Sequence, residues 1–136
     1  MDLKDSLLIS AAALKAQGTR VRVIAENVAN SDSTAITPGG DPYRRKTIAF
    51  KDVMDRAAGV SKLTVDKVGT DKSDFGLRYD PGNPGANAQG YVKTPNVKPM
   101  IEMMDLKQAQ RSFEANLSVI DTSKSMMQRS IDLLRN

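Results

Sequence analysis

The sequence contains no cysteine, no histidine and no tryptophan, and its 136 residues include three phenylalanines and three tyrosines. Without cysteine and histidine the chain has no disulfide, no thiolate nucleophile, no imidazole base and none of the usual zinc ligands. Its sixteen acidic residues show no paired arrangement of the kind that acid–base or metal chemistry uses. The sequence therefore predicts that the protein is not an enzyme and has neither a metal site nor a cofactor.

Long hydrophobic runs are missing as well. No segment approaches the roughly 18 consecutive apolar residues that a membrane span needs. The stretch LLISAAAL (7–14) resembles the apolar part of a signal peptide, but Asp2 and Asp5 outweigh Lys4 before it and the apolar spacing continues beyond any cleavage site. We expect a soluble protein without direct membrane insertion, which can leave the cytoplasm only without a cleaved secretory signal.

An excess of one charge is nearly absent, since 20 basic residues face 16 acidic ones and the net charge is +4. The one dense basic run is YRRK (43–46). We interpret this run as a solvated or protein-facing loop, so no nucleic-acid partner is expected, although a basic nucleic-acid binder stays among the alternatives.

An apolar stripe is present along the first thirty residues. It repeats every seven positions at Leu7, Leu14, Val21 and Val28, with Ile24 beside it. Charged residues lie on the other side of the same helical projection. This pattern predicts a helix from about residue 3 to 30.

The C-terminal third repeats the pattern more strongly. Its apolar heptad positions are Leu106, Phe113, Ile120, Met127 and Leu134. Small or polar residues occupy the complementary core position, at Ala109, Asn116, Ser123 and Ser130. Because proline is tolerated in the first turn, Pro99 marks the start of a helix from about residue 100 to 134.

The fold class that follows is mainly α with a small β-rich insert. The long terminal helices, 1–32 and 100–136, are expected to pair as an antiparallel coiled-coil-like hairpin around a middle segment, 33–99, of loops and short strands. Within it, 62–68 and 75–80 are predicted to form a hairpin, 91–94 a third strand, and 48–58 a short helix or an extended arm. Such a pair leaves part of each stripe uncovered. Either a partner covers it, or the helices form an ordinary hairpin folded over the middle segment.

The segment ENVANSDST (26–34) resembles the signature near the N-terminus of the bacterial flagellar rod, hook and hook-associated proteins. In most members a Gly-Tyr follows the threonine, whereas this chain has AITPGGDPYRRKTIAF (35–50) there. That longer connection resembles the rod proteins of the family in particular, as does GYVKTPNVKPMIEMMDLKQAQRSFEANLSVIDTSKSMM (90–127). The similarity covers both ends and nearly the whole chain.

This resemblance implies a structural subunit of the proximal rod, the part of the flagellar drive shaft nearest the inner membrane. Family members pair their terminal helices as an inner layer, stack helically around an export channel, and are exported to the periplasmic side by the flagellar type III apparatus without signal cleavage. The implied partners are the chain itself and other rod proteins, with the membrane-supramembrane ring and the export gate as further candidates. A coiled-coil adaptor or chaperone-like protein unrelated to flagella is the alternative.

Two asparagines and the basic run complete the expected assembly site. We expect Asn30 to adopt the left-handed conformation at the helix end while its side chain bonds local backbone. Asn27 is expected near the stripe, where a buried amide selects the helix register. Arg44, Arg45 and Lys46 are expected to reach acidic or carbonyl groups of an adjacent subunit. The full set of expected interface residues is Leu7, Leu14, Val21, Ile24, Asn27, Val28, Asn30, Arg44, Arg45, Lys46, Leu106, Phe113, Asn116, Ile120, Met127 and Leu134.

Overall fold

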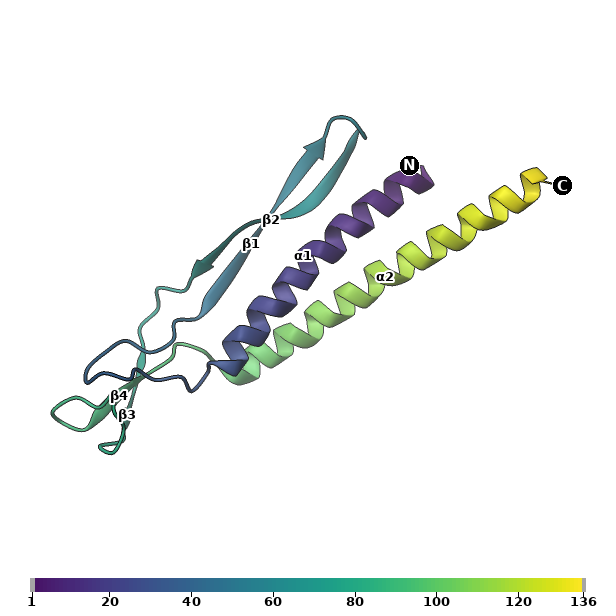
Figure 1. Ribbon diagram of the computed structural model, residues 1–136. Helices are drawn as coiled ribbons and strands as arrows, with labels where there is room; N and C mark the ends of the chain where they lie inside the picture. Colours follow the sequence, from purple (N-terminus) through teal and green to yellow (C-terminus); the bar gives the residue numbers. More distant parts are fainter. Residues whose placement is uncertain (1, 136) are drawn as a thin grey trace. The chain divides into compact units, whose positions relative to one another are not determined.

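The computed structural model describes residues 2–135 and contains two long helices and two two-stranded sheets (Figure 1). In chain order the elements are α1 (Leu3–Ala29), β1 (Lys46–Asp55), β2 (Val60–Thr70), β3 (Gly76–Tyr79), β4 (Tyr91–Thr94) and α2 (Pro99–Arg135). The predicted class, mainly α with a small β-rich insert, is confirmed.

The helices follow the sequence pattern closely. α1 has 27 residues and α2 has 37, and each boundary lies within one residue of the predicted one. Pro99 is the first residue of α2, where its missing N–H costs no hydrogen bond because first-turn donors have no partner within the helix. Periodicity and a single proline therefore determine both elements locally.

The end of α1 differs from the expectation for Asn30. No non-glycine residue among 2–135 has a positive φ, so Asn30 is not left-handed. Its backbone N–H instead donates to the Glu26 carbonyl at 3.1 Å, and its side-chain amide donates to the same oxygen at 2.9 Å. The predicted bond from the side chain to local backbone is therefore present, and it caps the last turn without any strained conformation.

The strands pair differently from the prediction. β1 pairs with β2, and β3 pairs with β4 in antiparallel register from Gly76 opposite Thr94 to Tyr79 opposite Tyr91. The predicted hairpin between 62–68 and 75–80 is wrong, and the undecided segment 48–58 is mainly strand. The four residues between β1 and β2 include Gly59 at φ 68°. Closing so short a loop costs little entropy, which favours this neighbour over a more distant one.

The chain divides into two compact units. One contains Met1–Val21, Ala49–Lys67 and Lys107–Asn136, and the other contains Arg22–Ile48 and Val68–Leu106. The first unit joins most of each helix to the outer part of the β1–β2 hairpin, whereas the second joins the end of α1, the start of α2 and the β3–β4 sheet. The separation by role into terminal helices and insert stays a prediction.

The buried face of α2 is the small and polar one. Ala109 is fully buried and Ser123 is nearly so, with Asn116 half-buried between them. The sequence placed the helix seam on the apolar heptad, but Phe113 in that heptad is 36% exposed and Met127 is also exposed. Helices approach each other most closely where the side chains between them are small, so the bulky apolar residues lie at the rim of the seam.

Candidate assembly site

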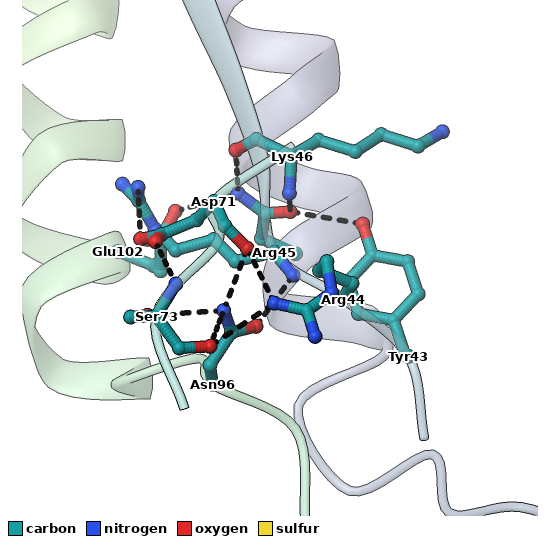
Figure 2. A network of polar contacts seen from close by, with 9 residues as sticks. Tyr43, Arg44, Arg45, Lys46, Asp71, Ser73, Asn96 and Glu102 are labelled. Carbon is teal, nitrogen blue, oxygen red and sulfur yellow. Dashed lines mark hydrogen bonds and ion pairs between the residues drawn. The ribbon is translucent and has the colours of Figure 1, made fainter. Parts of the chain in front are cut away.

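A cluster of buried and half-buried polar groups joins the end of α1, the start of β1 and the first turn of α2. We call it the polar junction and define it by Asn27, Tyr43, Arg45, Lys46 and Glu102. Asn27 and Glu102 are each only 1% exposed. Figure 2 shows the segment 43–46 beside both helices, with Arg45 next to Glu102 and Arg44 turned toward Asp71 and Ser73.

Asn27 uses its whole hydrogen-bonding capacity within the polar junction. Its Nδ2 donates to the Lys46 carbonyl at 2.9 Å and to Glu102 Oε2 at 3.1 Å. Its Oδ1 accepts from the Lys46 N–H at 2.8 Å and from the Tyr43 hydroxyl at 2.9 Å. Two donors and two acceptor sites are all that an amide side chain offers. Asn27 is therefore buried, as predicted, and it ties the incoming strand to both helices.

The Tyr43 hydroxyl stays a proton donor in this site. Its pKa is raised, first because burial disfavours the phenolate and then because the carboxylates of Glu26 and Glu102 add to this effect against the opposing charge of Lys46. The hydrogen bond to Asn27 is therefore maintained throughout the neutral range.

Glu102 is a buried carboxylate with two partners. Its Oε2 accepts from Asn27, and its Oε1 accepts from Arg45 Nε. Arg45 Nη1 also lies 3.6 Å from Asp71 Oδ2. Burial of the Arg45 guanidinium lowers its pKa, but the Glu102 hydrogen bond and the charges of Glu102, Asp71 and Asp105 outweigh this, so the pKa of Arg45 is raised. A paired and hydrogen-bonded charge is the form in which burial is tolerated.

Arg44 points to a different part of the same unit. Its Nη1 donates to the carbonyls of Asp71 at 2.8 Å and Ser73 at 3.0 Å. Its guanidinium carbon lies 4.1 Å from the centre of the Phe75 ring, which is a cation–π distance. Arg44 thus anchors the segment that leads from β2 to β3.

Lys46 forms an ion pair with Glu26, its Nζ lying 2.6 Å from Glu26 Oε2. This hydrogen bond is the main reason that the pKa of Glu26 is lowered and that of Lys46 is raised. The three basic residues therefore have acidic and carbonyl partners of the expected kind, but these partners belong to the chain itself, because 43–46 lies against the end of α1, the start of α2 and the segment after β2. A contact of Arg44, Arg45 or Lys46 with an adjacent subunit stays a prediction.

Asn96 extends the polar junction toward the segment after β2 (Figure 2). Its Oδ1 accepts from the Arg45 N–H at 2.7 Å, and its Nδ2 donates to the Asp71 carbonyl at 3.0 Å and to Ser73 Oγ at 3.1 Å. The backbone N–H of Ser73 also donates to the Asp71 carboxylate and is the largest cause of its lowered pKa. One amide thus holds three segments together.

Sequence reasoning missed Tyr43, Asp71, Asn96 and Glu102. For Glu102 a signal was available, because it lies seven residues before Ala109 and so occupies the small and polar heptad position. However, an acidic residue in the first turn of a helix is usually explained by its favourable interaction with the positive end of the helix dipole. No comparable pattern marked Asp71 or Asn96, which become neighbours of Arg45 only through the fold.

A row of apolar side chains lies exposed along the outer half of α2. We call it the exposed face of α2 and define it by Phe113, Leu117, Met127, Ile131 and Leu134. The exposed fraction of these side chains ranges from 36% at Phe113 to 89% at Leu134. Several exposed apolar side chains on one face of a helix are typical of an interaction site.

The other expected interface residues are distributed between the interior and the rim. Ile24 is buried, whereas the following are half-buried: Leu7, Leu14, Val21, Val28, Asn30, Arg44, Arg45, Lys46, Leu106, Asn116 and Ile120. The structure therefore brings Asn27, Arg45 and Lys46 together at the polar junction, while Met127 and Leu134 lie on the exposed face of α2.

Between α1 and α2 lies an open groove of about 320 Å³, lined by Gly18, Val21, Gln110, Phe113 and Glu114. A Cβ atom built on Gly18 would lie 3.9 Å from Phe113 Cε2, an ordinary contact. Among residues 2–135, no cluster of three acidic side chains is arranged to bind a metal ion. Neither described helix is long and apolar enough to cross a bilayer.

Comparison with known proteins identifies similar chains. A family model described as "Flagellar basal body rod FlgEFG protein C-terminal" matches residues 88–133. The flagellar basal-body rod protein FlgC of Agrobacterium fabrum is 48% identical, covering 93% of this chain and 91% of that protein. The proteins of the same name from Salmonella typhimurium, 42% identical over 98% of both chains, and Bacillus subtilis, 38% identical over 94% and 95%, are also similar.

Proposed function

Since the chain belongs to the family of the flagellar basal-body rod protein FlgC and is a structural subunit of the basal-body rod, we propose that it polymerises helically in the proximal rod. In this assembly it transmits motor torque and helps to enclose the export channel. Its partners are further copies of the chain and other rod proteins, and the membrane-supramembrane ring and the export gate are candidates at the ends of the rod. The adaptor or chaperone unrelated to flagella is not supported by this family membership.

The proposal also includes an export route and a location in the cell envelope. The subunit is exported by the flagellar type III apparatus without a cleaved signal and assembles on the periplasmic side of the inner membrane. It acts as a structural element and not as an enzyme. The residue types support this role, because a chain without cysteine can cross into an oxidising space without forming wrong disulfides.

The exposed face of α2 is the observation that carries the proposal. Leu134 is 89% exposed and Ile131 is half exposed, although both continue the apolar spacing of the helix. Burying a leucine side chain stabilises by about 1.5–3 kcal/mol relative to leaving it in water. A subunit with several such side chains uncovered therefore gains stability when neighbouring subunits cover them.

The experiment replaces Leu134 or Ile131 with aspartate in a flagellated host that lacks its own subunit of this family. We expect the variant to be produced but absent from isolated basal bodies, and the cells to be non-motile. Arg129→Asp is the matched control, since it changes the charge at an exposed position on the opposite side of the same helix. Normal incorporation and swimming of the Leu134 and Ile131 variants would contradict the proposed interface.

A further inference from the structure

α1 and α2 meet along surfaces that repeat every seven residues, and this repetition determines their register only weakly. On α2 the buried positions Ala109 and Ser123 are small. The apolar heptad repeats beside them, so that shifting α2 by one heptad replaces Phe113 with Leu106 or Ile120. An exchange of one apolar side chain for another at the rim of a seam costs little compared with the burial of an unpaired charge.

Glu102 breaks this repetition. It occupies the heptad position of Ala109, so a shift by one heptad in one direction places Ala109 opposite Asn27. A shift in the other direction places Pro95 there, which lies before the start of α2. Either shift removes the Glu102 carboxylate from Asn27 Nδ2 and from Arg45 Nε, which it joins in the structure.

We infer that Glu102, acting through Asn27 and Arg45, sets the register in which α1 and α2 pair. Each of its oxygens has one dedicated donor, and both Glu102 and Asn27 are 1% exposed, so no solvent replaces a lost partner. A single buried polar residue specifies register in coiled coils by the same physical means, because only one alignment satisfies it. The register in turn decides which apolar residues of α2 face outward. The register is a property of the single chain and is independent of the proposed function.

The absence of native cysteine makes the register measurable by cross-linking of engineered thiols. Gly18→Cys combined with Phe113→Cys reports the observed register, because a Cβ atom at position 18 lies within 3.9 Å of the Phe113 ring and a short cross-linker spans the space that the ring leaves. Gly18→Cys combined with Leu106→Cys or Ile120→Cys reports a shift by one heptad. The purified full chain is treated with a short bifunctional thiol cross-linker at a concentration where far-UV circular dichroism gives the helix content of the structure. We expect the observed-register pair to react at least about tenfold faster, and Glu102→Ala to reduce this preference to within about threefold.

Two further variants make the result specific to Glu102. Asp121→Ala removes an exposed carboxylate from the same helix, away from the groove between α1 and α2, and is expected to leave the preference unchanged. Glu102→Gln keeps the size of the side chain but offers one acceptor oxygen to two donors, so the preference is expected to fall at least threefold. If Glu102→Ala does not reach the helix content of the unmodified chain, Glu102→Gln provides the test of the cross-linking preference. The inference would be overturned by any one of three results. These are an undiminished preference in either Glu102 variant that folds, an equal loss in Asp121→Ala, and no preference when the junction is unmodified.

Discussion

Replacing Asn27 with alanine removes four hydrogen bonds at one position, to the backbone of Lys46, the hydroxyl of Tyr43 and the carboxylate of Glu102. Tyr43 and Lys46 are half-buried and recover part of their hydrogen bonding from water, whereas Glu102 is 1% exposed and does not. An orphaned buried polar group costs about 1–3 kcal/mol, and more when it is charged. We therefore expect a loss of about 3 kcal/mol, a large share of the 5–15 kcal/mol that typically stabilises a domain.

Urea unfolding of the purified chain, followed by far-UV circular dichroism and begun at a concentration where the helix content is that of the structure, measures this loss. With a slope of about 2 kcal/mol per molar urea, the midpoint is expected to fall by about 1.5 M. Hydrogen exchange adds a local measurement, because the Lys46 amide donates to Asn27 Oδ1 at 2.8 Å and is expected to exchange faster in the variant. The two measurements separate a general loss of stability from opening of the polar junction.

Asn116→Ala is the matched control. Asn116 is half-buried and its amide donates only to the Ser112 carbonyl, at 2.8 Å within the same helix. Alanine is the better helix former, which offsets the lost local bond, so the change is expected to stay below about 0.5 kcal/mol. A free energy of unfolding for Asn27→Ala within about 1 kcal/mol of the unmodified chain, with unchanged exchange at Lys46, would refute the importance assigned to the polar junction.

Three further outcomes are expected. Phe113→Asp should abolish incorporation into basal bodies while the β3–β4 sheet stays folded, and Ser118→Asp, at a neighbouring exposed position, should not; normal swimming of the Phe113 variant would mean that the face is wrongly assigned. The isolated monomer should show less helicity than the structure, because uncovered amphipathic helices are marginal; circular dichroism with full helicity at dilute monomeric concentration would disprove this. The lowered pKa of Glu26 means that its contribution to stability is present above its ordinary pKa near 4.3 and is lost as the pH falls through its lower folded value. Urea midpoints measured between pH 7 and 3 should show a smaller acid-side loss in Lys46→Met, and an identical loss in both proteins would count against the ion pair.

The helices were predictable because each is encoded within its own segment. Heptad spacing and Pro99 determine where helix is favoured, and these are local properties that no partner has to supply. The burial of Asn27 followed from its place near the stripe for the same reason. The sequence also indicated that part of the apolar surface lacks cover within the chain, and the exposed face of α2 confirms this.

The tertiary structure alone decided what the polar residues bond to. Arg45 bonds to Glu102, which lies 57 residues away in the sequence, and to Asn96, which lies 51 residues away. Nothing in the local sequence of these segments distinguishes such partners from polar groups of another subunit. Strand pairing was undetermined for the same reason, since segments such as 62–68 suit more than one neighbour until loop closure selects one. Periodicity states which face of a helix avoids water, but the size of the side chains that meet there decides whether that face lies in the seam or at its rim. Ala109 lies in the seam and Phe113 at its rim because only the smaller side chain lets the two helices approach closely.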